Sequence, residues 1–162
     1  MAALPKRPSP MNASIRRAVD AVELPTQERC HIAEWSNSAD DPALSIAHAR
    51  VPVGVTTRWH RVAGTVERYV VLQGRGRMEA GGLPPTEVGP GDVVIIPADC
   101  AQRIANTGKE DLLFLAICTP RFRHGAYEDI DPAPFDPDGA DAGWSTAAAP
   151  STHANSTAGH AP

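Results

Sequence analysis

The chain has 162 residues, of which 42% are hydrophobic and 5% aromatic, and its formal net charge is −4. A chain of this length is expected to form one domain, and the hydrophobic fraction is sufficient for a core. The acidic balance excludes nucleic acid as an expected partner, because nucleic-acid-binding domains carry a basic face. No apolar run is long enough to span a bilayer, and no apolar segment follows the first basic residues, so neither a membrane nor a secretory signal is expected.

The first 27 residues are expected to be a flexible lead-in that contains one short helix. Within residues 12–22 an Asn or a Ser can cap a helix at its start. Three apolar residues then recur at helical spacing, which would place them on one face: Ile15, Val19 and Val22. The sequence therefore predicts a short N-terminal helix before the main domain.

Residues 28–130 are predicted to form a single β-barrel domain with a closing segment. Alternating hydrophobic patterns and β-branched residues predict strands at 29–35, 43–51, 58–62, 66–74, 76–82, 92–98, 102–106 and 111–119. Gly, Pro and Asn recur at short intervals between them, as in turns. Many short strands with evenly spaced turns favour an antiparallel sandwich or barrel, so the fold class is predicted to be all-β.

Two further segments follow the last predicted strand. In residues 121–130, Phe122 and Tyr127 are expected either to fold back over the mouth of the barrel or to belong to an exposed connection. In the first case Arg121 or Arg123 would offer a cation to an acidic substrate. Residues 131–162 are rich in Pro, Ala and Asp and poor in large apolar residues, so a disordered tail is expected.

The polar residues of three predicted strands point to an enclosed site. Alternate residues of a strand share a face, so His60 lies on the same side as Arg58, and Glu67 on the same side as Tyr69. Gln102 occupies the corresponding place in the strand at 102–106. Each set mixes polar residues with apolar neighbours, which is typical of the wall of a pocket. His, Glu and Gln are also possible ligands for a divalent ion.

The order and spacing of these residues resemble the two motifs of the cupin superfamily, G(x)5HxH(x)3–4E(x)6G and G(x)5PxG(x)2H(x)3N. The first motif is matched by Gly54, His60, Glu67 and Gly74, and the second by Gly91, Pro97 and Asn106. Asp99 stands where the second motif has its later glycine, and Gln102 where it has its histidine. The resemblance implies a small single-domain cupin, a double-stranded β-helix or jelly-roll barrel.

The first motif lacks one of its two histidines, and the gap can be placed in two ways. If His60 occupies the first histidine position, Val62 replaces the second and the spacing to Glu67 matches the family. If His60 occupies the second position, Arg58 replaces the first and the loop to Glu67 is longer. Both placements leave His60 facing the barrel interior. They differ in whether a methyl group or a guanidinium lies beside it.

The leading hypothesis from this resemblance is a cupin enzyme with one divalent metal ion held by His60, Glu67 and Gln102. The ion would be Fe, Mn, Ni or Zn and would serve oxygenase-type or isomerase- or lyase-type chemistry on a small anionic substrate. Arg58, Trp59 and Arg103 are the predicted substrate-binding residues. The catalytic residues are then predicted to be His60, Glu67 and Tyr69.

Two alternatives use the same barrel without a metal. In the first, His60 and Glu67 act as base and acid in an isomerase, epimerase or dehydratase, Arg58 holds a substrate anion through its bidentate fork, and Tyr69 donates to a developing enolate. In the second, the protein is a sensor or binding module that holds a small ligand without turnover.

The cysteine spacing and the resemblance set the remaining expectations. Three widely spaced cysteines without a CxxC pair favour a reduced chain in the cytoplasm and no structural zinc. The barrel is also expected to form a homodimer, because cupins commonly close their edge strands by pairing with a second copy.

Overall fold

The computed structural model of the protein describes residues 11–134, which form eleven β-strands and two single turns of 3-10 helix. The strands are β1 (Glu23–Pro25), β2 (His31–Ser36), β3 (Ser45–Val51), β4 (His60–Val62), β5 (Val66–Gln73), β6 (Gly76–Ala80), β7 (Thr86–Val88), β8 (Val93–Ile96), β9 (Gln102–Asn106), β10 (Leu112–Thr119) and β11 (Tyr127–Asp129). The turns are η1 (Ala18–Asp20) and η2 (His124–Ala126). Within this part of the chain no helix is long and apolar enough to cross a membrane.

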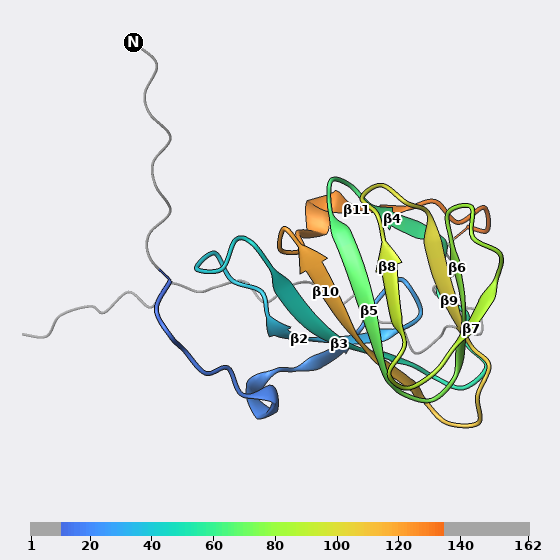
Figure 1. The fold of residues 1–162 in the computed structure, drawn as a ribbon, viewed down its shortest axis with the longest axis horizontal. Helices are drawn as coiled ribbons and strands as arrows, with labels where there is room; N and C mark the ends of the chain where they lie inside the picture. The colour runs from blue at the N-terminus through green and yellow to red at the C-terminus, as the bar shows by residue number, and fades with distance from the viewer. Residues whose placement is uncertain (1–10, 135–162) are drawn as a thin grey trace, which may run out of the picture.

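The strands form two antiparallel sheets that face each other across the core (Figure 1). One sheet has six strands in the order β1-β2-β3-β10-β5-β8, and the other has five in the order β11-β4-β9-β6-β7. The chain crosses repeatedly between the sheets, so sequence neighbours such as β5 and β6 lie in different layers. The predicted all-β fold class is confirmed, and each predicted strand overlaps an observed one.

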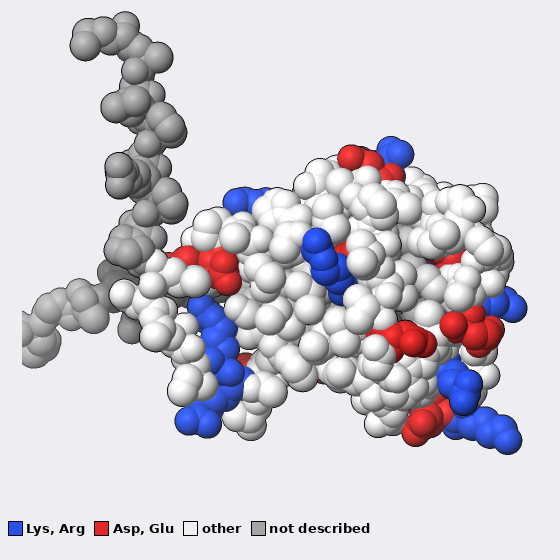
Figure 2. All heavy atoms as spheres, viewed as in Figure 1, with Lys and Arg blue, Asp and Glu red and all other residues white. Residues whose placement is uncertain are grey.

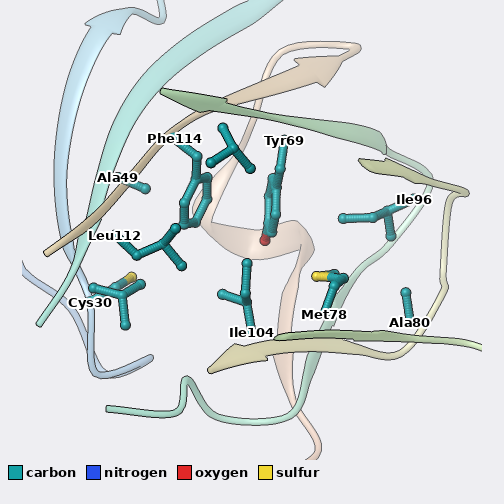
Figure 3. Packing of buried hydrophobic residues seen from close by; sticks show 11 residues of the cluster. Cys30, Ala49, Tyr69, Met78, Ala80, Ile96, Ile104, Leu112 and Phe114 are labelled. Carbon is teal, nitrogen blue, oxygen red and sulfur yellow. The ribbon is translucent and has the colours of Figure 1, made fainter. Parts of the chain in front are cut away.

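The core fills the space between the two sheets. Figure 3 shows Tyr69 and Phe114 side by side on the six-stranded sheet, facing Ile104 and Met78 of the other sheet. The rings of Tyr69 and Phe114 lie 4.4 Å apart between centroids. Full burial of a large aliphatic side chain contributes about 1.5–3 kcal/mol, so the buried side chains of this layer account for much of the stability.

The outer face of the six-stranded sheet is unusually apolar. Figure 2 views the molecule from this side, over β10, β5 and β8, and shows a mostly uncharged surface with one basic side chain near its middle and other charged groups toward its edges. Leu72 of β5 is 44% exposed, and Val93 and Ile95 of β8 are 55% and 64% exposed. The predicted homodimer stays a prediction, because the structure contains one chain.

The predicted N-terminal helix is wrong. In place of a helix over residues 12–22 the chain forms only the single turn η1, and β1 begins soon afterwards. The three residues of the predicted apolar face are 83%, 84% and 70% exposed: Ile15, Val19 and Val22. A helix this short is marginal in water unless its apolar face is buried, and here that face stays exposed.

The C-terminal part of the described chain forms an edge strand of the five-stranded sheet. β11 pairs antiparallel with β4, which places Tyr127 opposite Val62 and Asp129 opposite His60. Figure 1 shows the two strands together at one end of the barrel. We call residues 127–133 the strap.

The strap and β1 lie close to the predicted domain boundaries. β1 falls within the stretch predicted as a lead-in, and the strap continues past residue 130, where the barrel was expected to end. Asp131, in the predicted tail, accepts a hydrogen bond from the backbone N–H of Trp59 at 2.9 Å. The rest of the predicted tail, from residue 135, lies outside the described residues.

Candidate functional site

The structure brings the three predicted metal-site residues together. His60 begins β4 and lies opposite Gln102, which begins β9. Glu67 reaches the same place from β5 in the other sheet, and its Oε2 accepts a hydrogen bond from Nε2 of Gln102. All three side chains are buried, with 3%, 6% and 1% exposure for His60, Glu67 and Gln102. Strand alternation together with the cupin resemblance thus predicted this cluster.

The imidazole of His60 is held in one orientation. Its Nδ1 lies 2.9 Å from the backbone carbonyl oxygen of Arg58, and because a carbonyl oxygen can only accept, Nδ1 carries the proton. In the neutral ring Nε2 then has a free lone pair. Tyr127 of the strap stacks on the imidazole with ring centroids 5.3 Å apart and planes at 26°. The histidine is thus a base whose reactive nitrogen has a fixed direction.

A second carboxylate, Glu28, faces that nitrogen. Its Oε2 lies 3.8 Å from Nε2 of His60, too far for a hydrogen bond but close enough for strong electrostatic interaction. Glu28 lies in the turn between β1 and β2, and its backbone carbonyl accepts a hydrogen bond from the Arg58 N–H at 3.1 Å. Sequence analysis missed this residue, because it belongs to no motif and a turn has no periodicity to indicate its direction.

Burial dominates the electrostatics of Glu67. Desolvation raises the pKa of Glu67, the nearby His60 lowers it, and the charge of Glu28 raises it again, with a net upward shift. The thiol of Cys118 donates to Oε1 of Glu67 at 3.6 Å. Burial and the neighbouring Glu67 also raise the pKa of Cys118, so this thiol stays protonated. Glu67 is therefore a carboxyl group that retains its proton more strongly than an exposed one.

This environment gives a stability prediction for Glu67→Gln. Because the pKa of Glu67 is raised in the folded state, its ionisation removes stability as the pH rises from the pKa of the unfolded chain through that of the folded protein. Glutamine has no such charge. We expect the variant to be more stable at pH 7 by on the order of 1 kcal/mol, a rise of a few degrees in Tm.

The measurement is thermal unfolding of both proteins at several pH values. The gain should vanish at a pH low enough to protonate Glu67 in both states. Glu110→Gln, at an exposed carboxylate, is the matched control and should change Tm by much less. A variant that is less stable than the parent at neutral pH would show that the Glu67 carboxylate is stabilised in the fold.

Arg58 does not offer its guanidinium to the barrel interior. Its Nε donates to Oδ2 of Asp129 at 2.7 Å, and its Nη2 donates to the carbonyl oxygen of Ala133 at the same distance. The side chain is 3% exposed. The guanidinium of Arg58 binds the strap, so its predicted role as an anion-binding group is not supported. Val62, the other candidate for the missing histidine position, is a buried apolar residue.

The remaining predicted site residues lie apart from His60. The guanidinium of Arg103 lies over the ring of Trp59 at 4.6 Å and pairs with Glu79 at 2.9 Å, and all three residues are partly exposed. Tyr69 belongs to the hydrophobic core. Among the hydrogen bonds of the described residues, none joins Tyr69 to the cluster around His60. The structure thus does not bring Trp59 or Arg103 into the site, whereas Tyr69 lies close enough to Glu67 and Glu28 for their charges, after burial, to raise the pKa of its hydroxyl.

The closing segment folds back over the site through one of its two aromatic residues. Tyr127 folds back over the site, as its stacking on His60 shows. Phe122 instead packs edge-on against His124, with ring centroids 5.4 Å apart. Arg121 donates to the side-chain oxygen of Asn37 at 2.9 Å, so it is already engaged away from the site.

Two buried polar atoms of the site have no hydrogen-bond partner among the described residues. They are Oε1 of Gln102 and the hydroxyl oxygen of Tyr127. Burial and the charge of Glu28 raise the pKa of Tyr127, so its hydroxyl remains a proton donor. An unsatisfied buried polar group is costly, and such groups are found mainly where a ligand or water completes the hydrogen bonding.

Sequence comparison identifies the family. The family model for the cupin domain matches residues 47–118. An uncharacterized protein of Methanocaldococcus jannaschii is 36% identical over 87 residues, which cover 54% of this chain and 69% of that protein. The matched region includes His60, Glu67 and Gln102, whereas Glu28 and Tyr127 lie outside the family match.

Solved structures share the fold at low sequence identity. Pac13 of Streptomyces, a nucleoside dehydratase, has a TM-score of 0.62 at 11% identity, covering 74% of this chain and 92% of its own. KdgF from Halomonas has a TM-score of 0.59 at 16% identity, with 67% and 96% covered. A predicted oxalate decarboxylase of Thermotoga maritima has a TM-score of 0.55 at 22% identity, with 66% and 99% covered. With its double-stranded β-helix barrel, this protein belongs to the cupin family.

Proposed function

We propose that this protein is a metal-independent acid–base enzyme that eliminates water from a small molecule or isomerises it. The observation that carries the proposal is the imidazole of His60, which is fixed by the Arg58 carbonyl so that Nε2 faces the carboxylate of Glu28. Buried Glu67, with its raised pKa, completes the pair of acid and base. The shared fold with a nucleoside dehydratase is consistent with such chemistry.

The donor set of the site does not fit a divalent metal ion. Within residues 11–134 no group of three or more His, Cys, Asp and Glu side chains is arranged to hold one. Gln102 presents its NH2 group, a donor, to Glu67 rather than its carbonyl oxygen. The metal-dependent enzyme favoured by the sequence motif therefore stays a prediction, and the proposed chemistry uses no metal.

The proposed proton transfers can be assigned to named atoms. In an elimination, Nε2 of His60 takes a proton from the carbon next to a carbonyl group, and the electron pair of that C–H bond forms a carbon–carbon double bond. The protonated carboxyl of Glu67 gives its proton to the departing hydroxyl, which leaves as water. The substrate loses one water, no oxidant is required, and both side chains return to their starting states by proton exchange.

The test uses the full chain purified without a metal-affinity tag. Its metal content is measured, and the protein is then treated with a chelator and incubated with sugars, nucleosides and their carbonyl derivatives. Mass spectrometry detects products that have lost one water, and NMR detects isomers of unchanged mass. We expect less than about a tenth of an equivalent of transition metal, and turnover that survives chelation.

Two outcomes would favour the other candidate functions. Turnover that chelation abolishes and a divalent ion restores would establish the metal-dependent enzyme. Gln102→His should then tighten metal binding, because imidazole is the stronger ligand. Tight ligand binding with no product from any compound would favour a binding or sensor module. The location in the cytoplasm stays a prediction in all three cases.

A further inference from the structure

We infer that the ligand of this site is an uncharged molecule with several hydroxyl groups, one of which donates a hydrogen bond to Gln102 Oε1 while Tyr127 donates to one of its oxygens. The inference rests on the proposed function only in placing the ligand at His60. It goes further by naming the charge and the hydrogen-bonding groups that the ligand must have.

The first argument is the unsatisfied acceptor of Gln102. This residue is 1% exposed, and its Nε2 donates to Oε2 of Glu67. Its Oε1 has no partner among the described residues. The group that satisfies it must therefore be a donor, either a hydroxyl or an N–H.

The other free positions also favour a ligand rich in hydroxyl groups. Nε2 of His60 presents a lone pair, and the carboxylate of Glu28 beside it only accepts. The hydroxyl of Tyr127 can both donate and accept, and it too has no partner. Acceptors thus outnumber donors around the site. A polyhydroxylated ligand matches them, because each hydroxyl donates one hydrogen bond and can accept another.

The charges around the site argue against an anion, in contrast to the substrate expected from sequence. The carboxylate of Glu28 lies 3.8 Å from Nε2 of His60, and an anionic ligand at His60 would meet it. Arg58 was expected to supply the positive charge that an anion needs, but its guanidinium forms an ion pair with Asp129. A cation is disfavoured for a different reason. Entering a buried site removes its hydration, and Glu67, with its raised pKa, is a poor counter-ion.

The test compares ligands that share a skeleton and differ in charge. One set is uridine, uridine 5′-monophosphate and 5′-amino-5′-deoxyuridine, and a second is glucose, glucuronate and glucosamine. Dissociation constants are measured by NMR, with the imidazole resonances of His60 followed in the full chain. We expect at least one neutral compound to bind at least tenfold more tightly than both of its charged counterparts and to shift those resonances.

Tyr127→Phe isolates the contribution of the unsatisfied hydroxyl. The variant should bind the neutral compound roughly 3- to 10-fold more weakly, the usual effect of one lost hydrogen bond. It should also have a higher Tm in the absence of ligand, because a buried hydroxyl without a partner has been removed. Glu128→Gln is the matched control on the same strand, where the side chain is exposed, and its affinity should stay within twofold.

The inference is overturned if an anionic or cationic member binds most tightly, if no neutral compound binds, or if Tyr127→Phe leaves the affinity unchanged. These results are separable from those for the proposed function. Neutral ligands that bind at His60 without turnover would uphold the ligand class while contradicting the acid–base chemistry. Turnover of an anionic substrate after chelation would uphold the acid–base chemistry while contradicting the ligand class.

Discussion

Replacing His60 by asparagine is expected to lower kcat/KM of the chelator-treated protein by a factor of about 100 to 10,000, the usual contribution of a positioned acid–base group. Asparagine keeps an amide N–H near the position of Nδ1, so the hydrogen bond to the Arg58 carbonyl can persist. It has no counterpart of Nε2. The loss should therefore fall on the proton transfer rather than on the fold.

The control for this variant is His48→Asn. His48 stacks on Trp35 with ring centroids 5.0 Å apart, away from the site, and its replacement should leave kcat/KM within a factor of about two. Thermal unfolding of both variants shows whether the fold is kept. A folded His60→Asn protein with undiminished turnover in chelator would remove His60 from the mechanism.

Replacing Arg58 by methionine is expected to release the strap. The change keeps most of the buried side-chain volume and removes the ion pair with Asp129 and the hydrogen bond to Ala133. Loss of one partner of a fully buried pair typically costs 3–5 kcal/mol. Because the Asp129 side chain is 29% exposed, we expect a smaller loss, about 2 kcal/mol.

Hydrogen exchange locates this loss. The amide of Ile130 donates to the carbonyl oxygen of Trp59 at 2.9 Å and reports directly on the attachment of the strap to β4. Its exchange should accelerate about 30-fold in Arg58→Met, the equivalent of 2 kcal/mol in local opening.

A neighbouring ion pair on the same strap is the control for Arg58→Met. Arg61 and Glu128 are 45% and 44% exposed, and exposed pairs contribute about 0–1 kcal/mol. Arg61→Met should therefore change the exchange of Ile130 only slightly. Equal acceleration in the two variants would show that the buried pair holds the strap no better than the exposed one.

Strand periodicity predicted correctly which side chains of the site lie inside the barrel. The alternation around His60, Glu67 and Gln102 correctly predicted that these side chains face the interior, because a strand allows only two directions for a side chain. The same rule did not predict which group the guanidinium of Arg58 binds. Its position on the inner side was correct, but the direction of its long side chain depends on Asp129, which is distant in sequence.

Glu28 and the N-terminal segment were not predicted correctly for the same physical reason: the structure of both depends on tertiary contacts. Glu28 lies in a turn, and its approach to His60 is set by packing between segments about thirty positions apart. The failed helix at residues 12–22 is the opposite case, in which a local pattern was present without a surface to support it. Local patterns report on local geometry, whereas both outcomes depended on tertiary contacts.

The site is assembled from residues inside and outside the region that matches the cupin domain. His60, Glu67 and Gln102 lie within the region that matches the cupin domain, whereas Glu28 precedes that region and Tyr127 follows it. The matched region thus contributes His60, Glu67 and Gln102, and the segments on either side of it contribute the groups that surround His60. Substitutions confined to the turn at Glu28 or to the strap would alter what surrounds His60 while leaving the matched region unchanged.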